Sequence, residues 1–160
     1  KNFFFIHNFS PRRPYFFKED CSINPDYSPS IPSEKIDNGY KNNYICALKK
    51  IKIFLDFINK NDPESIVVIQ GDHGWNNDLN INLNENDKII YRAKIFNSIK
   101  APENCFDRFG LPRTNINTIR FALNCALGYD FKKVEDMHFI NFNEKEKDYG
   151  KVINRTELLK

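Results

Sequence analysis

The stretch Ile66-Val67-Val68-Ile69-Gln70-Gly71-Asp72-His73-Gly74 joins a continuous apolar run to a short polar end. A run of branched apolar residues is typical of a strand that is buried on both faces, as the strands of parallel sheets are. The glycines at positions 71 and 74 let the backbone turn sharply and approach a ligand closely. We therefore expect a buried strand that delivers a polar pair, Asp72 and His73, at its carboxyl end.

The segment before this strand predicts a long helix over 39–60. Its apolar residues recur at spacings of three and four, and Asn61-Asp62-Pro63 is a typical helix stop. A helix followed by a strand buried on both faces is typical of a βαβ unit. The sequence therefore predicts an α/β fold whose mainly parallel sheet is sandwiched by helices, with ligands bound at the carboxyl ends of the strands.

The remaining segments fit this scheme by their apolar patterns. We expect a second helix over 114–127, because Gly128 follows it as a C-terminal cap. The other predicted strands are 2–8, 89–99 and 137–142, and the predicted loops are 18–38, 75–88 and 101–112. The charged tail from Asn143 is expected to fray.

Asp72 and His73 are the chemistry-bearing residues of the polar end. A carboxylate oxygen and an imidazole nitrogen from adjacent residues can bind one cation, and Zn²⁺ and Mn²⁺ both accept such mixed ligands. The alternative is a polar turn in which Asp72 caps the next segment. Spacing alone does not choose between the two interpretations.

Composition excludes several classes of protein. The chain has 160 residues, 41% of them hydrophobic, which suffices for one domain with a core. Its longest apolar runs, 3–6 and 66–69, fall far short of the roughly 20 residues that span a bilayer. The net charge of +3 is scattered, with no basic stripe, so nucleic acid is not an expected partner. Because the chain enters a strand-like segment directly, we expect an excerpt whose export signal or membrane anchor lies upstream.

Residues 66–74 resemble the metal-binding strand of the alkaline phosphatase superfamily, with a closer likeness to its sulfatase-like branch, which includes phosphoethanolamine transferases and lipoteichoic acid synthases. In that branch the motif usually reads Ser-Asp-His-Gly, and its Asp and His bind the catalytic metal. This chain has Gly71 in place of the Ser. The resemblance implies that residues 1–142 are the C-terminal part of such a catalytic domain and that 143–160 form a charged tail.

Further segments resemble the same family in the same order: 4–15, 44–59, 91–97 and 115–121. The likeness covers nearly the whole chain but only the C-terminal half of the family's catalytic domain. The family's nucleophile and early acidic metal ligand lie in the other half, and no stretch here resembles them. We therefore expect this chain alone to be catalytically incompetent.

The resemblance implies part of a metal-dependent hydrolase or transferase. Its substrate would be a phosphate or sulfate ester of a glycan or a lipid headgroup, and its cofactor a divalent ion (Zn²⁺, Mn²⁺, Mg²⁺ or Ca²⁺). One alternative is a degenerate domain that binds an anionic glycan or lipid headgroup without turnover. Another is a cytosolic α/β binding module without metal.

Four more residues enter through the resemblance. Arg12 stands where the family usually has His, and Arg12 and Arg13 would bind the substrate anion, although a solvated loop pair is the alternative. His7 is either a core histidine or a supporting group of the site. Trp75 either lines the substrate cleft or packs inside.

The cysteines are Cys21, Cys46, Cys105 and Cys125, and none has the CxxC spacing of a zinc site. Composition alone allows four buried thiols or two disulfides. The related enzymes are membrane-associated and work in the periplasm or at the outer face of the cytoplasmic membrane, where disulfides persist. The resemblance thus implies an extracytoplasmic protein with the local pairs Cys21–Cys46 and Cys105–Cys125, each tethering a loop to a helix, although four cysteines allow three pairings.

Overall fold

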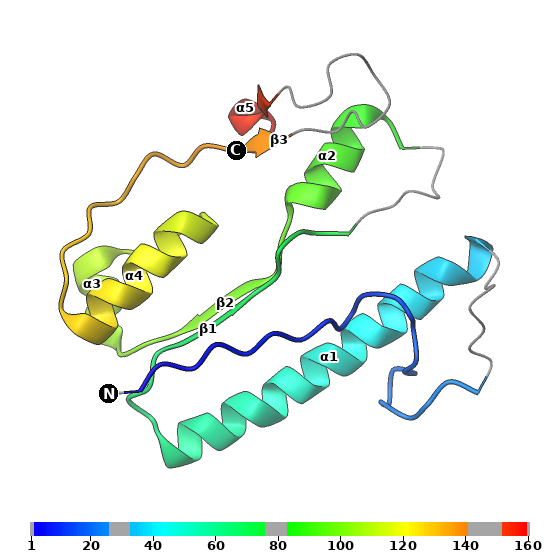
Figure 1. Cartoon of the computed structure of the whole chain (residues 1–160), viewed down its shortest axis with the longest axis horizontal. Coiled ribbons are helices and arrows are strands. Elements are labelled where there is room, and N and C mark those ends of the chain that lie inside the picture. Colours follow the sequence, from blue (N-terminus) through cyan, green and yellow to red (C-terminus); the bar gives the residue numbers. More distant parts are fainter. Residues whose placement is uncertain (1, 26–32, 76–82, 141–151, 160) are drawn as a thin grey trace. The chain divides into compact units, whose positions relative to one another are not determined.

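The computed structural model describes residues 2–25, 33–75, 83–140 and 152–159. The chain forms two compact units, Lys1–Pro63 and Glu64–Lys160, called here unit 1 and unit 2. Figure 1 labels the elements of both units. Each unit is described by itself.

Unit 1 is built on one long helix, α1 (Ser33–Asn61). The predicted helix over 39–60 is confirmed, and it begins six residues earlier than its apolar pattern indicated. Pro63 follows its last residues, and the amide of Asp62 still donates to the carbonyl of Ile58 at 2.8 Å. Proline cannot continue the helical hydrogen-bond pattern, so the helix ends where the sequence indicates.

The segment 15–25 packs against the N-terminal half of α1. Tyr15 is buried, and a Cβ atom at Gly39 would lie 2.7 Å from its ring, so a glycine is needed for this approach. The amide of Phe17 donates to the side-chain oxygen of the buried Asn43 at 3.3 Å. Phe17 and Ile23 form an isolated antiparallel bridge that closes the segment into a loop.

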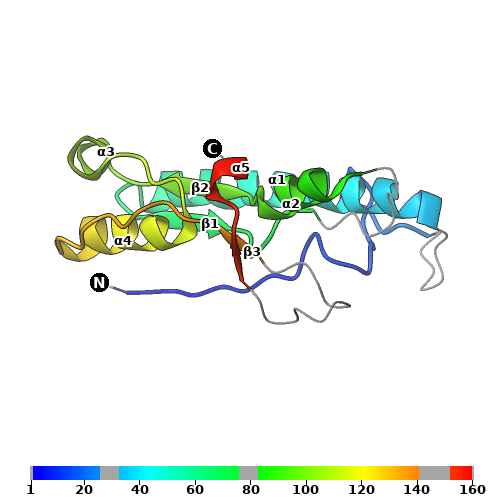
Figure 2. The same ribbon diagram turned by 90° about the horizontal axis from the view of Figure 1, so that it is seen from above.

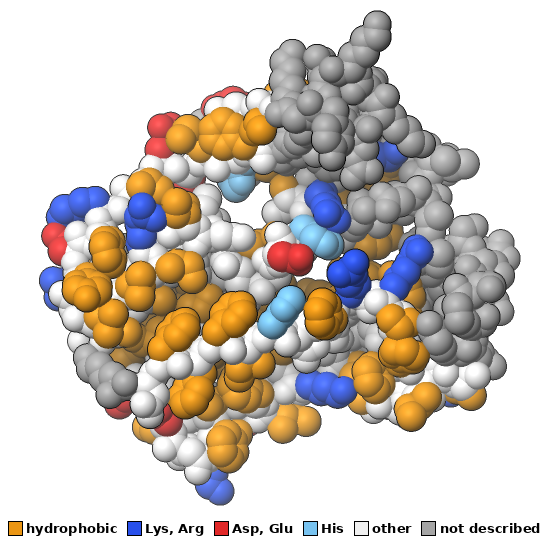
Figure 3. Space-filling model, viewed as in Figure 1, with side chains coloured by type: hydrophobic (Ala, Val, Ile, Leu, Met, Phe, Trp, Pro, Cys, Tyr) orange, Lys and Arg blue, Asp and Glu red, His pale blue; other side chains and the backbone are white. Residues whose placement is uncertain are grey.

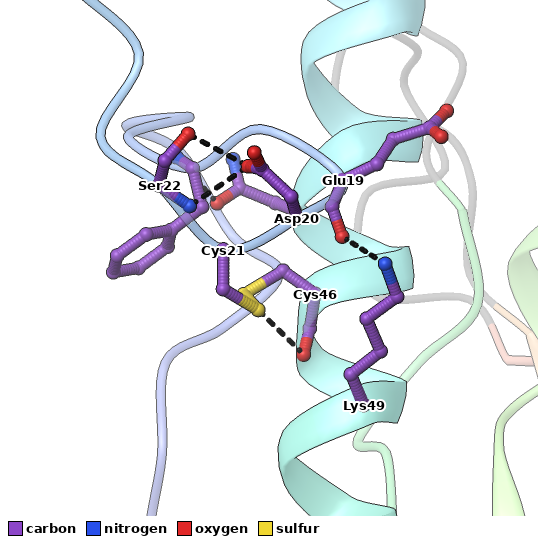
Figure 4. The surroundings of a disulfide bond; sticks show 8 residues. Glu19, Asp20, Cys21, Ser22, Cys46 and Lys49 are labelled. Atoms are coloured by element: carbon purple, nitrogen blue, oxygen red, sulfur yellow. Dashed lines mark hydrogen bonds between the residues drawn. A yellow bond between two sulfur atoms is a disulfide. The ribbon is translucent and has the colours of Figure 1, made fainter.

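A disulfide joins this loop to the helix (Figure 4). Cys21 and Cys46 are bonded, with their Cα atoms 5.0 Å apart, and Cys46 is almost completely buried. Close to it, the ammonium group of Lys49 donates to the carbonyl of Glu19 at 2.7 Å. The expected loop-to-helix tether is therefore present in unit 1.

The predicted buried strand over 2–8 is wrong. This segment is not part of a strand, and its side chains are exposed, with 86% of Phe3 and 82% of Phe5 accessible. Figure 3 shows hydrophobic side chains, drawn in orange, over much of the face in view. An apolar run predicts a strand only where a neighbouring strand satisfies its backbone, and the described residues give this segment no ladder of backbone hydrogen bonds.

Unit 2 contains two small antiparallel sheets. β1 (Val67–Gln70) pairs with β2 (Asn97–Lys100), so that Val67 faces Lys100 and Gln70 faces Asn97. β3 (Phe139–Ile140) pairs with β4 (Ile153–Asn154). The strand predicted at 66–70 is present as Val67–Gln70, but its residues are half-buried, so the predicted burial on both faces is wrong. Of the strand predicted at 137–142, two residues belong to β3, and positions 141–142 lie outside the described residues.

The predicted fold class, a mainly parallel sheet sandwiched by helices, is wrong. Every strand pair among the described residues is antiparallel, and most of the described regular structure is helical. The amide of Gly71 donates to the carbonyl of Phe96 at 2.8 Å, which holds the two ends of the β1–β2 connection together. A connection that returns to the end it left gives an antiparallel pair, whereas a parallel pair needs a crossover to the opposite end.

The strand predicted over 89–99 is a helix in its first half. α2 (Glu85–Ala93) is capped by Asn84, whose side-chain oxygen accepts the amide of Asp87 at 2.9 Å. Ile89 is its buried residue. The alternating apolar residues suggested a strand, but the N-terminal cap and the acidic first turn favour a helix at this point.

Unit 2 also contains two helices that a disulfide links, α3 (Glu103–Phe109) and α4 (Asn115–Leu127). Figures 1 and 2 show α3 beside one end of α4. α3 lies where a loop was predicted, and α4 confirms the second predicted helix, with Gly128 in the left-handed region at φ 73°. Cys105 and Cys125 form a disulfide between the two helices rather than between a loop and a helix. The ring of Phe106 packs 5.0 Å from that of Phe121, measured between centroids.

Two buried asparagines of α4 hold the extended segment 131–136. Asn124 exchanges two hydrogen bonds with the backbone of Phe131, and Asn117 exchanges two with the backbone of Val134, all between 2.8 and 3.0 Å. After it, residues 152–159 form β4 and α5 (Thr156–Leu159), so this part of the tail is structured and the prediction of fraying is wrong there. Positions 143–151 lie outside the described residues. No described helix has the length and hydrophobicity needed to cross a bilayer.

Candidate metal site at the end of β1

The loop after β1 is fixed to the C-terminal end of α2. The amide of Gly74 donates to the carbonyl of Arg92 at 2.7 Å, and Gly74 is buried. An added Cβ atom at Gly74 would collide with the carbonyl oxygens of Tyr91 and Lys94. The close backbone approach expected from the glycines therefore occurs at Gly74, where it sets the position of the preceding Asp72 and His73.

Asp72 and His73 present their side chains together at this loop. The side chains are 90% and 44% exposed, and Oδ2 of Asp72 lies 3.8 Å from Nε2 of His73. The other carboxylate oxygen, Oδ1, accepts the backbone amide of His73 at 2.9 Å. Asp72 thus takes part in the local turn through one oxygen, as the polar-turn interpretation expects, and keeps the second oxygen beside the imidazole.

The tautomer of His73 follows from its neighbours. Its Nδ1 lies 2.7 Å from the carbonyl oxygen of Gly74 and 3.2 Å from Nη1 of Arg92. A carbonyl only accepts hydrogen bonds and a guanidinium only donates them, so one Nδ1 cannot bond to both. The shorter contact favours a proton on Nδ1 that is donated to Gly74, which leaves a lone pair on Nε2. This nitrogen is the one next to the carboxylate of Asp72.

The two atoms are spaced for a shared cation. Two ligand atoms at tetrahedral positions, each about 2.1 Å from the metal, lie about 3.4 Å apart. Oδ2 of Asp72 and Nε2 of His73 are 3.8 Å apart, and a small side-chain rotation would bring them to that separation. Among the described residues, no group of three or more His, Cys, Asp or Glu side chains is arranged to hold a metal. The described part of the chain thus supplies a fitting ligand pair, and a tetrahedral site needs further ligands.

Arg92 is the neighbour of this pair that sequence reasoning missed. It lies in the last turn of α2. The predicted strand over 89–99 would have placed alternate residues on opposite faces and so gave no reason to bring this residue to the loop. The cap at Asn84 and Asp87 is the signal that would have placed it on a helix ending at the loop. Trp75 is half-buried, and its ring meets that of Tyr91 edge to face at 5.8 Å.

The other predicted site residues belong to unit 1. Arg12 is exposed, and its amide closes a turn by donating to the carbonyl of Phe9 at 2.8 Å. The guanidinium of Arg13 lies 5.9 Å from the ring centroid of Tyr15. His7 is exposed, with its ring 4.7 Å from that of Phe9, so it is not a core histidine of this unit.

A polar cluster at the start of α4 is structural. The side chains of Thr114 and Asn117 donate to Oδ1 of Asp136 at 2.9 and 2.8 Å. Burial opposes ionisation of Asp136, but the two hydrogen bonds and the positive charges of Lys133 and Arg113 outweigh it and lower the pKa of the carboxyl group. This charge is engaged in holding segment 131–136 to the helix.

The environment of the protein follows from its two disulfides. Disulfides form and persist in oxidising compartments, so the chain belongs to a non-reducing environment. Comparison of the chain with protein-family models, curated protein sequences and solved structures found no match.

Proposed function

We propose that this chain is part of a metal-dependent hydrolase or transferase that acts on phosphate or sulfate esters. Asp72 and His73 would bind the divalent ion, which is Zn²⁺, Mn²⁺, Mg²⁺ or Ca²⁺. The observation that carries the proposal is the 3.8 Å separation of Oδ2 and Nε2, with Nδ1 of His73 engaged by Gly74. The resemblance of residues 66–74 to the metal-binding strand of sulfatase-like enzymes supports the same assignment.

The residues of this chain would prepare the metal site in three ways. Asp72 supplies negative charge, His73 supplies a neutral nitrogen ligand, and the carbonyl of Gly74 fixes the ring through the proton on Nδ1. When bound, the ion would polarise an ester oxygen and activate a nucleophile. We assign no nucleophile within these 160 residues. The substrate would be a glycan or lipid headgroup ester in the periplasm or at the outer face of the cytoplasmic membrane.

A second candidate function is binding of an anionic glycan or lipid headgroup without turnover. Arg12 favours it, because the family usually has His at this position. A guanidinium binds phosphate or sulfate but cannot donate a proton to a leaving group near neutral pH.

Metal binding by the whole chain tests the leading proposal. Zn²⁺ affinity is measured by competition with a chromophoric chelator for the parent chain and for the Asp72→Asn and His73→Gln variants. Asp107→Asn and His138→Gln are matched controls, because each makes the same chemical change at another position of unit 2. We expect the first two to weaken Zn²⁺ binding at least about tenfold, or about 1.4 kcal/mol, and the controls to leave it within about twofold.

The result that would overturn the proposal is equal Zn²⁺ affinity for the parent, Asp72→Asn and His73→Gln. Loss of affinity in His138→Gln instead would place the metal elsewhere. The ester class is tested by titrating the Zn²⁺-loaded parent with 4-nitrophenyl phosphate and with 4-nitrophenyl sulfate. We expect one of the esters to bind and to be displaced competitively by inorganic phosphate or sulfate.

A further inference from the structure

Arg92 is a cation beside the Asp72–His73 pair, and His73 is the only described residue that its guanidinium approaches within hydrogen-bond distance. Its Nη1 lies 3.2 Å from Nδ1 of His73, a nitrogen that also lies 2.7 Å from the carbonyl oxygen of Gly74 and is a donor in the tautomer assigned above. Two donors that face each other form no hydrogen bond. Among the described residues, no carboxylate lies within 4.0 Å of the Arg92 guanidinium.

The backbone fixes where this guanidinium lies. The carbonyl of Arg92 accepts the amide of Gly74 at 2.7 Å, so the last turn of α2 and the loop that carries Asp72 and His73 are held together. The residue is half-buried, which restricts the conformations of its side chain. A positive charge is therefore held against the proposed ligand pair.

We propose that Arg92 is the anion-binding residue of this site, an inference that rests on the proposed function. It would bind an oxygen of a tetrahedral oxyanion, the phosphate or sulfate group of the substrate. A guanidinium presents several N–H donors in one plane and forms charge-assisted hydrogen bonds with such groups. The oxyanion would satisfy the donors that His73 cannot. Arg92 thereby supplies a binding group within unit 2 itself, whereas Arg12 and Arg13 belong to unit 1.

The single tryptophan makes this binding measurable. Trp75 follows the loop directly, and its ring meets Tyr91, the neighbour of Arg92 in sequence. A ligand at Arg92 is therefore expected to change the fluorescence of Trp75. The test is a titration of the whole chain with potassium phosphate, and separately with potassium sulfate, in the presence of EDTA and at constant ionic strength.

Three variants define the result. In Arg92→Gln the backbone carbonyl that holds Gly74 stays in place, and we expect the dissociation constant of the oxyanion to rise at least about tenfold. Arg92→Lys keeps the charge without the planar donors, so we expect its dissociation constant for the oxyanion to lie between those of the parent and Arg92→Gln. Lys94→Gln removes an exposed cation two residues away and is expected to change the constant by less than about twofold.

The inference is overturned if the parent shows no saturable response to either anion, if Arg92→Gln binds like the parent, or if Lys94→Gln loses as much affinity as Arg92→Gln. Zn²⁺ binding by the same variants separates this failure from that of the proposed function. Arg92→Gln is expected to keep Zn²⁺ binding. If Arg92→Gln weakens anion binding while Asp72→Asn and His73→Gln leave Zn²⁺ affinity unchanged, the metal proposal alone is overturned.

Discussion

Gly74→Ala tests whether the Asp72–His73 loop is held by its contact with the end of α2. A Cβ atom at position 74 would collide with the carbonyl oxygens of Tyr91 and Lys94, and it would lie 3.0 Å from that of Arg92. These atoms belong to backbone, which cannot rotate away as a side-chain tip can. The loop must therefore move, and the hydrogen bond from Gly74 to Arg92 is strained or lost.

The magnitude follows from two contributions. Overpacking of a tight site costs roughly 1–3 kcal/mol. Loss of a buried backbone hydrogen bond costs about 1 kcal/mol more. We therefore expect Gly74→Ala to lower the free energy of unfolding of unit 2 by about 2–4 kcal/mol. With a urea dependence of about 2 kcal/mol per molar, the midpoint falls by roughly 1–2 M. Trp75 fluorescence reports the transition from the adjacent residue.

Gly71→Ala is the matched control within the same loop. A Cβ atom there would meet its nearest neighbour, the carbonyl oxygen of His73, at 3.5 Å, an ordinary contact distance. Its effect on the free energy of unfolding is expected to stay within about 0.5 kcal/mol. Equal midpoints for the two variants would refute the claim that α2 fixes the loop through Gly74.

Three further predictions concern the supports of each unit. Replacing Cys21 and Cys46 together by serine opens a loop of 25 residues and should destabilise unit 1 by about 3 kcal/mol, as measured by circular dichroism during thermal unfolding. Asn124→Ala removes a buried side chain that makes two hydrogen bonds with the backbone of Phe131, and at about 1 kcal/mol each their loss should cost about 2 kcal/mol in urea unfolding; an unchanged midpoint would contradict this. The pKa of Asp136 is lowered in the folded state, so its carboxylate stabilises the fold at pH values above its unfolded pKa. This contribution disappears as the pH falls through the folded pKa. The difference in free energy of unfolding between the parent and Asp136→Asn should therefore shrink below about pH 4.

The sequence was sufficient where local signals and tertiary structure agree. α4 was predictable because its apolar spacing ends at Gly128, which caps it in the left-handed conformation. The strand at Val67–Gln70 was predictable from its branched apolar run. The positions of Asp72 and His73 at the end of that strand followed directly.

The sequence was insufficient where pairing partners and packing decide the structure. The apolar run of β1 suggested a strand buried on both faces, but the strand is half-buried, and its neighbour, joined through the contact of Gly71 with Phe96, is antiparallel. The alternating apolar residues from Ile89 suggested a strand over 89–99, whereas the cap at Asn84 starts a helix that runs to Ala93. That error also hid Arg92, since its proximity to His73 depends on where the helix ends.

Long-range ¹⁵N NMR of the imidazole rings during Zn²⁺ titration tests the central claim most directly. The chain has three histidines, so His73 can be assigned with the variant His73→Gln. We predict that His73 carries its proton on Nδ1 without metal, and that Zn²⁺ shifts the resonance of its Nε2 while His7 and His138 stay unchanged. A proton on Nε2, or a Zn²⁺ response at His7 or His138 in place of His73, would contradict the account.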